Sequence, residues 1–136
     1  MSKPFELPVR VYYEDTDAQG VVYYANYFRF LERARTEWLR SLGIDMLRLQ
    51  EEERRIFVVA EVNVKFLAPA RLNEDLLVTA GLVDSTRVAF DIEQEIYRNN
   101  TDGDLLISGI VKAAFLDADS MRPKRLPPSL FEGMTS

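Results

Sequence analysis

Apolar and polar residues alternate along the first part of the chain. The positions on one side of this alternation are apolar or aromatic: Phe5, Leu7, Val9, Val11 and Tyr13. Charged residues such as Glu6 and Arg10 occupy the other side. A period of two predicts a half-buried β-strand. The alternation stops at a polar segment, residues 14–20, which contains a glycine and predicts a loop.

From about Tyr24 to Leu42 the apolar positions follow a helical period. The stripe consists of aromatic and aliphatic residues at spacings of three and four: Tyr27, Leu31, Ala34, Trp38 and Leu42. Gly43 follows at the position where a helix commonly ends. A helix of this length measures roughly 28 Å, which is enough to cross a small domain. The charged segment 45–55 predicts one short helical turn and a loop.

Four strand patterns follow the helix, over residues 56–66, 76–82, 88–96 and 105–115. In the first of these, the alternation predicts that Ile56, Val58, Ala60, Val62, Val64 and Phe66 share one face. Asn99–Gly103 predicts a hairpin loop, and the tail from about residue 121 to 136 predicts irregular structure. One strand, one long helix and four consecutive strands indicate an α+β fold. We expect a single domain over residues 1–136, with a curved antiparallel five-stranded sheet wrapped around the helix.

Composition narrows the possible chemistry. The 17 basic and 22 acidic residues give a net charge of −5, which argues against nucleic acid as a partner. No apolar run approaches the ~20 residues of a transmembrane helix, and the N-terminus lacks an apolar signal region, so we expect a cytoplasmic protein. The chain contains no cysteine and no histidine. These absences exclude thiol nucleophiles, Ser–His pairs and His or Cys metal ligands, and we expect no metal site.

The chemistry that remains available points to the loop before the helix. Asp15 and Asp17 precede Gly20, and the predicted helix begins at about Tyr24. A helix N-terminus presents unpaired N–H groups that stabilise negative charge on a carbonyl oxygen. Together with a carboxylate, these groups form a minimal hydrolytic site. On these features alone, capping or turn formation is the commoner role for such aspartates.

Longer motifs favour the catalytic interpretation. Residues 11–27, VYYEDTDAQGVVYYANY, resemble the signature of the 4-hydroxybenzoyl-CoA thioesterase family of hotdog-fold proteins. FLERARTEWLRSLG at 30–43, VKFLAPARL at 64–72 and MRPKRLP at 121–127 resemble its subgroup of Tol–Pal-associated acyl-CoA thioesterases. The resemblance covers nearly the whole chain. It implies the hotdog fold, in which a curved antiparallel sheet wraps around one helix.

The resemblance also implies an activity, the hydrolysis of acyl-CoA to a carboxylic acid and free CoA. It assigns Asp17 as nucleophile or general base and the backbone N–H of Tyr24 as the donor that polarises the thioester carbonyl. Substrate contacts are expected at Gly20, Tyr23 and Asn26. Basic side chains are needed for the CoA phosphates, and Arg87 is the first candidate, with Lys65 as another.

Two positions depart from the subgroup pattern, which usually has His where this chain has Tyr24 and Gly where it has Gln19. A backbone donor does not depend on its side chain, so the departure affects substrate preference and rate more than activity. A thiol leaving group with a pKa near ~8.5 departs without a strong acid. The alternative is a non-catalytic module that binds acyl-CoA or an acyl carrier protein. Hotdog dehydratase chemistry is excluded because it needs histidine.

Partners follow from the same reasoning. Acyl-CoA is the expected substrate, an acyl carrier protein is a further candidate partner, and no separate cofactor is expected because CoA is part of the substrate. The edges of a five-stranded sheet must be protected or paired. The resemblance implies edge-to-edge dimers with the active site at the subunit boundary, so we expect a homodimer or homotetramer.

Overall fold

The computed structural model describes residues 4–131. A short 3₁₀ turn, Tyr13–Asp15, follows the first strand, and a π-helical turn, Leu49–Glu53, continues the second helix. The labelled elements are β1 (Phe5–Arg10), α1 (Tyr24–Ser41), α2 (Met46–Arg48), β2 (Arg55–Phe66), β3 (Asp75–Ser85), β4 (Ala89–Arg98) and β5 (Leu105–Asp117). The predicted α+β class and element order are confirmed, and the predicted turn in residues 45–55 is longer than expected.

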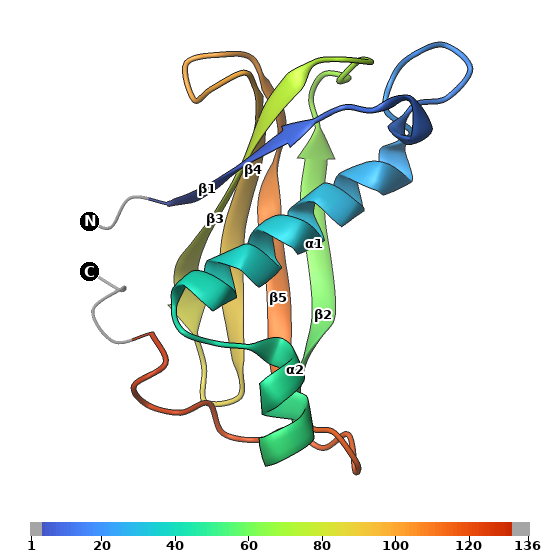
Figure 1. Cartoon of the computed structure of the whole chain (residues 1–136). Helices are drawn as coiled ribbons and strands as arrows, with labels where there is room; N and C mark the ends of the chain where they lie inside the picture. Colours follow the sequence, from blue (N-terminus) through green and yellow to red (C-terminus); the bar gives the residue numbers. More distant parts are fainter. Residues whose placement is uncertain (1–3, 132–136) are drawn as a thin grey trace.

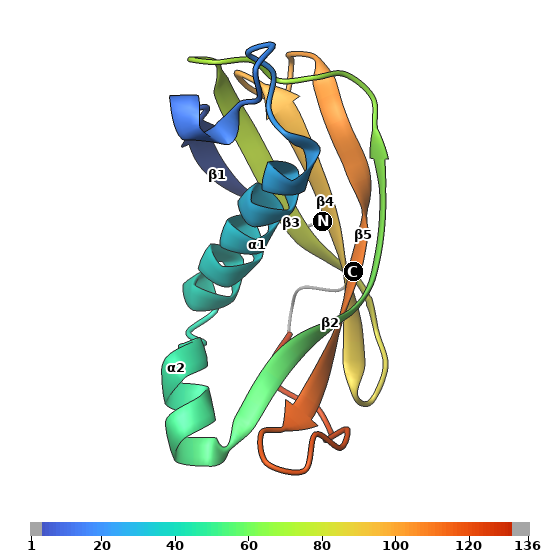
Figure 2. The same cartoon turned by 90° about the vertical axis from the view of Figure 1, so that its right-hand side faces the viewer.

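The five strands form one antiparallel sheet with the order β1-β3-β4-β5-β2. β1 and β2 are therefore its two edges. The sheet curves around α1, which crosses its concave face (Figure 1). A view from the side shows β2 bending away from the helix, so the helix does not cover this edge (Figure 2).

Helix α1 begins where the sequence predicts and ends one residue earlier. Its buried face consists of Tyr27, Phe30, Leu31, Ala34, Trp38 and Leu39. At its C-terminus, the N–H of Gly43 donates to Arg40 O (2.9 Å) and that of Ile44 donates to Leu39 O (3.0 Å). Gly43 has a φ of +88°, which a residue with a Cβ adopts only with strain. A Schellman motif thus fixes the end of the helix.

The core consists of two apolar clusters, one along each half of α1. The cluster along the C-terminal half contains Trp38, which stacks on Phe131 with ring centroids 5.7 Å apart. Leu126 is buried in the same cluster. Residues 121–131 contain no helix or strand, yet they cover this end of the core; residues 132–136 of the predicted tail lie outside the described residues.

Two predictions about strand residues are wrong. β1 ends at Arg10, and Tyr13 is 82% exposed in the 3₁₀ turn, because the Asp15 carboxylate accepts the Tyr12 N–H (2.8 Å) and favours a turn over a strand. In β2, the register shifts between Val59 and Glu61. This β-bulge changes which residues face inward, so Val59 joins Val62 on the helix side of the sheet and Ile56 does not.

Candidate active site

A tight hairpin over residues 16–22 carries Asp17. Thr16 pairs with Val22, and the N–H of Asp17 donates to Val21 O (2.9 Å). Gly20 turns the chain with a φ of +78°, and its added Cβ would meet no other atom within 4 Å, so the backbone angle alone requires glycine. The returning arm of the hairpin runs directly into α1. The fold thereby holds Asp17 beside the start of the helix.

The Asp17 side chain is exposed at the tip of this hairpin. Its Oδ1 accepts a hydrogen bond from the Gln19 N–H (2.9 Å), which fixes the orientation of the carboxylate. Within residues 4–131 Asp17 forms no ion pair. The carboxylate is therefore oriented by the backbone while it remains accessible to a reactant.

The N-terminus of α1 is uncapped, and the helix begins two residues after the hairpin. Tyr23 occupies the N-cap position without a side-chain hydrogen bond, and the first turn contains no acidic residue. The N–H of Tyr23 donates to Asp15 O (3.0 Å) and that of Asn26 to Tyr23 O (2.8 Å). Over the described part of the chain, the Tyr24 N–H has no acceptor. This free donor lies at the positive end of the helix dipole, which suits a developing oxyanion.

A second layer of contacts holds the hairpin, and sequence reasoning missed it. The N–H of Val22 donates to Ala70 O (2.8 Å), and the N–H of Ala70 donates to the hydroxyl oxygen of Tyr27 (2.9 Å). Arg98 donates to Pro69 O (2.8 Å) and pairs with Glu74 (2.6 Å). Burial raises the pKa of the Tyr27 hydroxyl. The sequence carries one signal of this contact. Tyr27 lies on the predicted buried face of the helix, and a buried tyrosine hydroxyl needs a hydrogen-bond partner.

Two other predicted contact residues, Tyr23 and Asn26, lie at the N-cap and in the first turn of α1. The Asn26 side-chain amide donates to Asp15 O (2.9 Å) and so ties the first helical turn to the preceding chain. The rings of Tyr23 and Tyr24 lie 5.0 Å apart, and Tyr24 meets Phe66 of β2 edge-on at 6.4 Å. Tyr24 is 61% exposed. An accessible aromatic surface therefore adjoins the donor.

Arg87 lies at the other end of the molecule. It occupies the β3–β4 turn, whereas the hairpin adjoins the opposite end of β3 (Figure 1). The ten residue steps from Asp75 to Ser85 span roughly 33 Å of extended strand. The N–H of Leu126 donates to Arg87 O (2.7 Å), so the tail brings Lys124 and Arg125 beside Arg87. Within one chain, the basic turn and Asp17 therefore lie at opposite ends of β3.

Lys65 lies on the convex face of the sheet. It pairs in register with Ser108 and borders a shallow hollow with Asn63 and Glu93. Its neighbour Phe66 points the other way, toward α1. The sheet therefore separates the Lys65 side chain from the aromatic surface beside Tyr24.

Within residues 4–131, no group of three acidic side chains is arranged to hold a metal ion. None of the helices in that range has the length and hydropathy of a membrane span.

The fold and the hairpin define a hotdog domain of the thioesterase type. A family model described as the thioesterase-like superfamily matches residues 11–133, and the chain belongs to this family. The acyl-CoA thioesterase YbgC of Haemophilus influenzae is 41% identical over 123 residues, which are 90% of this chain and 88% of that protein. The acyl-CoA thioester hydrolase YbgC of Escherichia coli O157:H7 is 41% identical over 126 residues, covering 93% and 92%.

Solved structures give the same fold. A probable thioesterase from Bartonella henselae is 31% identical, with a TM-score of 0.85 over 92% of this chain and 100% of that chain. The 4-hydroxybenzoyl-CoA thioesterase of a Pseudomonas species is 20% identical, with a TM-score of 0.86 over 96% and 99%. The hotdog fold expected from the sequence is confirmed.

Proposed function

We propose that this protein is an acyl-CoA thioesterase that hydrolyses the thioester to a carboxylic acid and free CoA. The observation that carries the proposal is that one continuous hairpin-to-helix segment presents an accessible, oriented Asp17 carboxylate and the free Tyr24 N–H of an uncapped helix. Relatives at 41% identity that are named acyl-CoA thioesterases support the same activity.

Each step of the reaction has a group to serve it. The thioester oxygen accepts the Tyr24 N–H, which polarises the carbonyl carbon and stabilises the tetrahedral oxyanion. Asp17 either attacks that carbon, and water then hydrolyses the anhydride, or it removes a proton from the attacking water. CoA departs as a thiolate, and its low basicity makes a strong general acid unnecessary. Neither route needs histidine.

The same proposal places the CoA phosphates on the basic turn of a second copy. Arg87, Lys124 and Arg125 are brought together by the tail and form no ion pair within residues 4–131. They lie at the opposite end of β3 from the hairpin of their own chain. One CoA thioester would therefore not readily contact both this basic turn and Asp17 of the same chain. An antiparallel pairing of two β2 edges reverses one copy relative to the other and brings each basic turn toward the partner's hairpin.

A thiol-release assay over a panel of acyl-CoAs tests the assignment. We expect Asp17→Asn to lower kcat by roughly 10²–10⁴-fold, because it removes the nucleophile or base. The matched control is Asp102→Asn, which alters an exposed aspartate in the β4–β5 loop. Equal rates for Asp17→Asn and the wild type would contradict the catalytic role of Asp17.

A binding module is the second candidate. It is favoured by the hydrogen bond that Asp17 already accepts from Gln19, which engages one carboxylate oxygen. In that case the wild type binds acyl-CoA or an acyl carrier protein tightly in calorimetry and releases no thiol from any member of the panel.

A further inference from the structure

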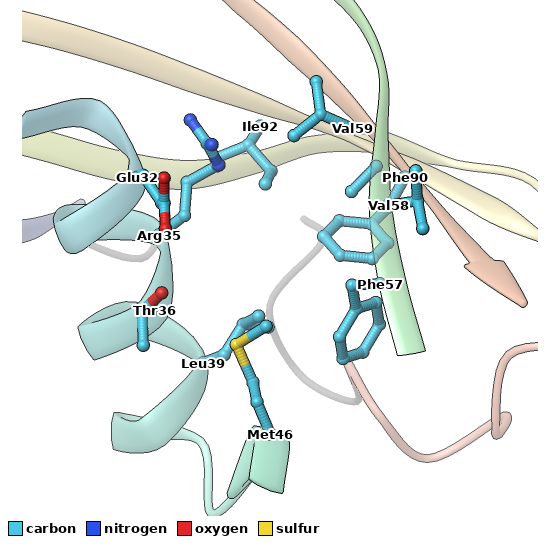
Figure 3. Close-up of a pocket in the computed structure, with 11 residues that line it drawn as sticks. Glu32, Arg35, Thr36, Leu39, Met46, Phe57, Val58, Val59, Phe90 and Ile92 are labelled. Atoms are coloured by element: carbon cyan, nitrogen blue, oxygen red, sulfur yellow. The ribbon is translucent and has the colours of Figure 1, made fainter. Parts of the chain in front are cut away.

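A cavity of about 170 Å³ lies between the C-terminal half of α1 and the inner face of β2 (Figure 3). It contains no residue of the 16–22 hairpin. Its walls are mainly apolar, with Phe57 from β2 and Phe90 and Ile92 from β4. A cavity of ~150 Å³ in an apolar core accommodates benzene, so this one has room for a ring or a six-carbon chain.

One wall of the cavity carries a cation. Arg35 projects from α1 toward Ile92 and Val59 and is mostly buried (Figure 3). Within the described residues, its hydrogen bond runs from Nη1 to Gln94 Oε1 (3.0 Å). Over residues 4–131 it has no carboxylate within ion-pair distance, although Glu32 lies one turn away on the same helix. Burial lowers the pKa of Arg35, an effect that the Glu32 charge opposes.

The Gln94 side chain fixes the orientation of this guanidinium. Gln94 is 0% exposed and lies between the two apolar clusters. Its Nε2 donates to Leu31 O (3.1 Å) and Thr79 O (3.2 Å), so both amide hydrogens are used and Oε1 must face Arg35. The guanidinium has five N–H donors, and within residues 4–131 only the bond to Gln94 uses one of them.

Arg35 is partly buried and has no paired carboxylate within residues 4–131, so an anion that enters the cavity can form a charge-assisted hydrogen bond with it. The apolar walls and the oriented guanidinium together select a molecule with an apolar body and an anionic end. We propose that this cavity is a carboxylate-binding site, in which Arg35 binds the carboxylate of a short-chain acid and the Phe57–Phe90–Ile92 wall packs on its hydrocarbon chain.

Binding of a free acid is the first test. Hexanoate and its neutral analogue hexanamide are titrated into the full-length protein, with calorimetry and the fluorescence of Trp38 as readouts. Trp38 is the sole tryptophan of the chain, and its ring lies 6.2 Å from that of Phe90 on the cavity wall. We expect hexanoate to bind roughly tenfold or more tightly than hexanamide, because a charge-assisted hydrogen bond is involved.

Three variants separate the causes. Arg35→Gln is expected to abolish the preference for hexanoate, and Ala113→Leu, which fills the cavity, to abolish binding of both compounds. Arg33→Gln is the matched control, because Arg33 is an exposed arginine on the same helix, and it is expected to bind like the wild type. Equal affinity for the two compounds, or an unchanged preference in Arg35→Gln, overturns the proposal.

The ligand of the cavity is either a free acid or an acyl group that carries a distal carboxylate, and enzyme kinetics distinguish the two. This experiment alone rests on the proposed function. If an acyl group supplies the carboxylate, the wild type shows a lower KM for adipoyl-CoA than for hexanoyl-CoA. Arg35→Gln then removes this difference in KM at similar kcat. If a free acid supplies the carboxylate, calorimetry shows the preference for hexanoate over hexanamide, and the KM values for adipoyl-CoA and hexanoyl-CoA are equal. A third outcome is that the wild type does not bind hexanoate and that Arg35→Gln no longer forms dimers. This outcome indicates that Arg35 forms an ion pair with a second copy, and it overturns the proposal.

Discussion

At the scale of single residues, substitutions of Tyr24 can distinguish the contribution of its backbone N–H from that of its side chain. Tyr24 is the first residue of α1, and Tyr23 before it has φ −62° and ψ 128°. Proline fits the first position of a helix and requires an extended residue before it. Tyr24→Pro therefore removes the N–H while it preserves the helix start. We expect kcat to fall roughly 10²–10³-fold, as for loss of an oxyanion donor, in the thiol-release assay.

Tyr24→Ala and Tyr24→His are the matched controls for Tyr24→Pro. Both variants keep the backbone N–H, and His is the residue that the Tol–Pal subgroup usually has at this position. We expect both to retain kcat within a few-fold and to differ mainly in KM, because the exposed ring lies beside Phe66 where the proposed substrate would bind. If Tyr24→Ala loses as much activity as Tyr24→Pro, the side chain and not the N–H supplies the catalytic contact.

At the scale of elements, Asp117 connects the end of β5 to the tail. Its Oδ2 accepts the N–H groups of Ser120 (2.7 Å) and Asp119 (3.1 Å), and its Oδ1 accepts from Arg55 (3.2 Å). The hydrogen bonds to Ser120, with smaller contributions from Asp119 and Arg55, lower the pKa of Asp117 below its usual value of 3.8. The turn that directs the tail back over the Trp38 cluster thus depends on an ionised carboxylate.

The depressed pKa of Asp117 predicts a dependence of stability on pH. A carboxyl group whose pKa is lower in the folded state stabilises that state above its unfolded pKa, and the contribution disappears as the pH falls through the folded pKa. Asp117→Asn is therefore expected to lower Tm at pH 7 and to lower it by less at a pH well below 3.8, as the Asp117 carboxylate of the wild type becomes protonated. Thermal unfolding followed by circular dichroism measures both. A Tm difference that is equal at the two pH values would contradict this role.

The same elements show how far the sequence could predict the structure. α1 and the four later strands follow from local periodicity, and Asp17 and Tyr24 belong to one continuous segment that the sequence already shows. The bulge in β2 depends on pairing with β5, which no local pattern records. The contacts of Gln94 with Leu31 and of Tyr27 with Ala70 join residues 63 and 43 positions apart. The cavity beside Arg35 and the support of the hairpin were therefore not predictable from the sequence.

At the scale of the whole molecule, the β2 edge is the surface at which we expect a second chain to pair. It is twelve residues long, and Val59 and Val62 on its inner face are 44% and 41% exposed. Long apolar edge strands pair with other chains unless they are covered. We expect a dimer in light scattering and a monomer for Val62→Lys, which places a charge on this face. A monomeric wild type at micromolar concentration would contradict the pairing.

A dimer with shared sites makes a stricter prediction, because Asp17 and Arg87 would then act in one site only when they come from different chains. Asp17→Asn and Arg87→Glu are each expected to be inactive at low acyl-CoA concentration, the first in chemistry and the second in binding. In a mixed dimer, one site carries both substitutions and the other carries none. Refolding the two variants together in equal amounts is expected to restore about a quarter of the wild-type activity, since half of the randomly formed dimers contain one intact site. If both residues served the same chain's site, no combination would contain an intact site, and the mixture would stay as inactive as its components.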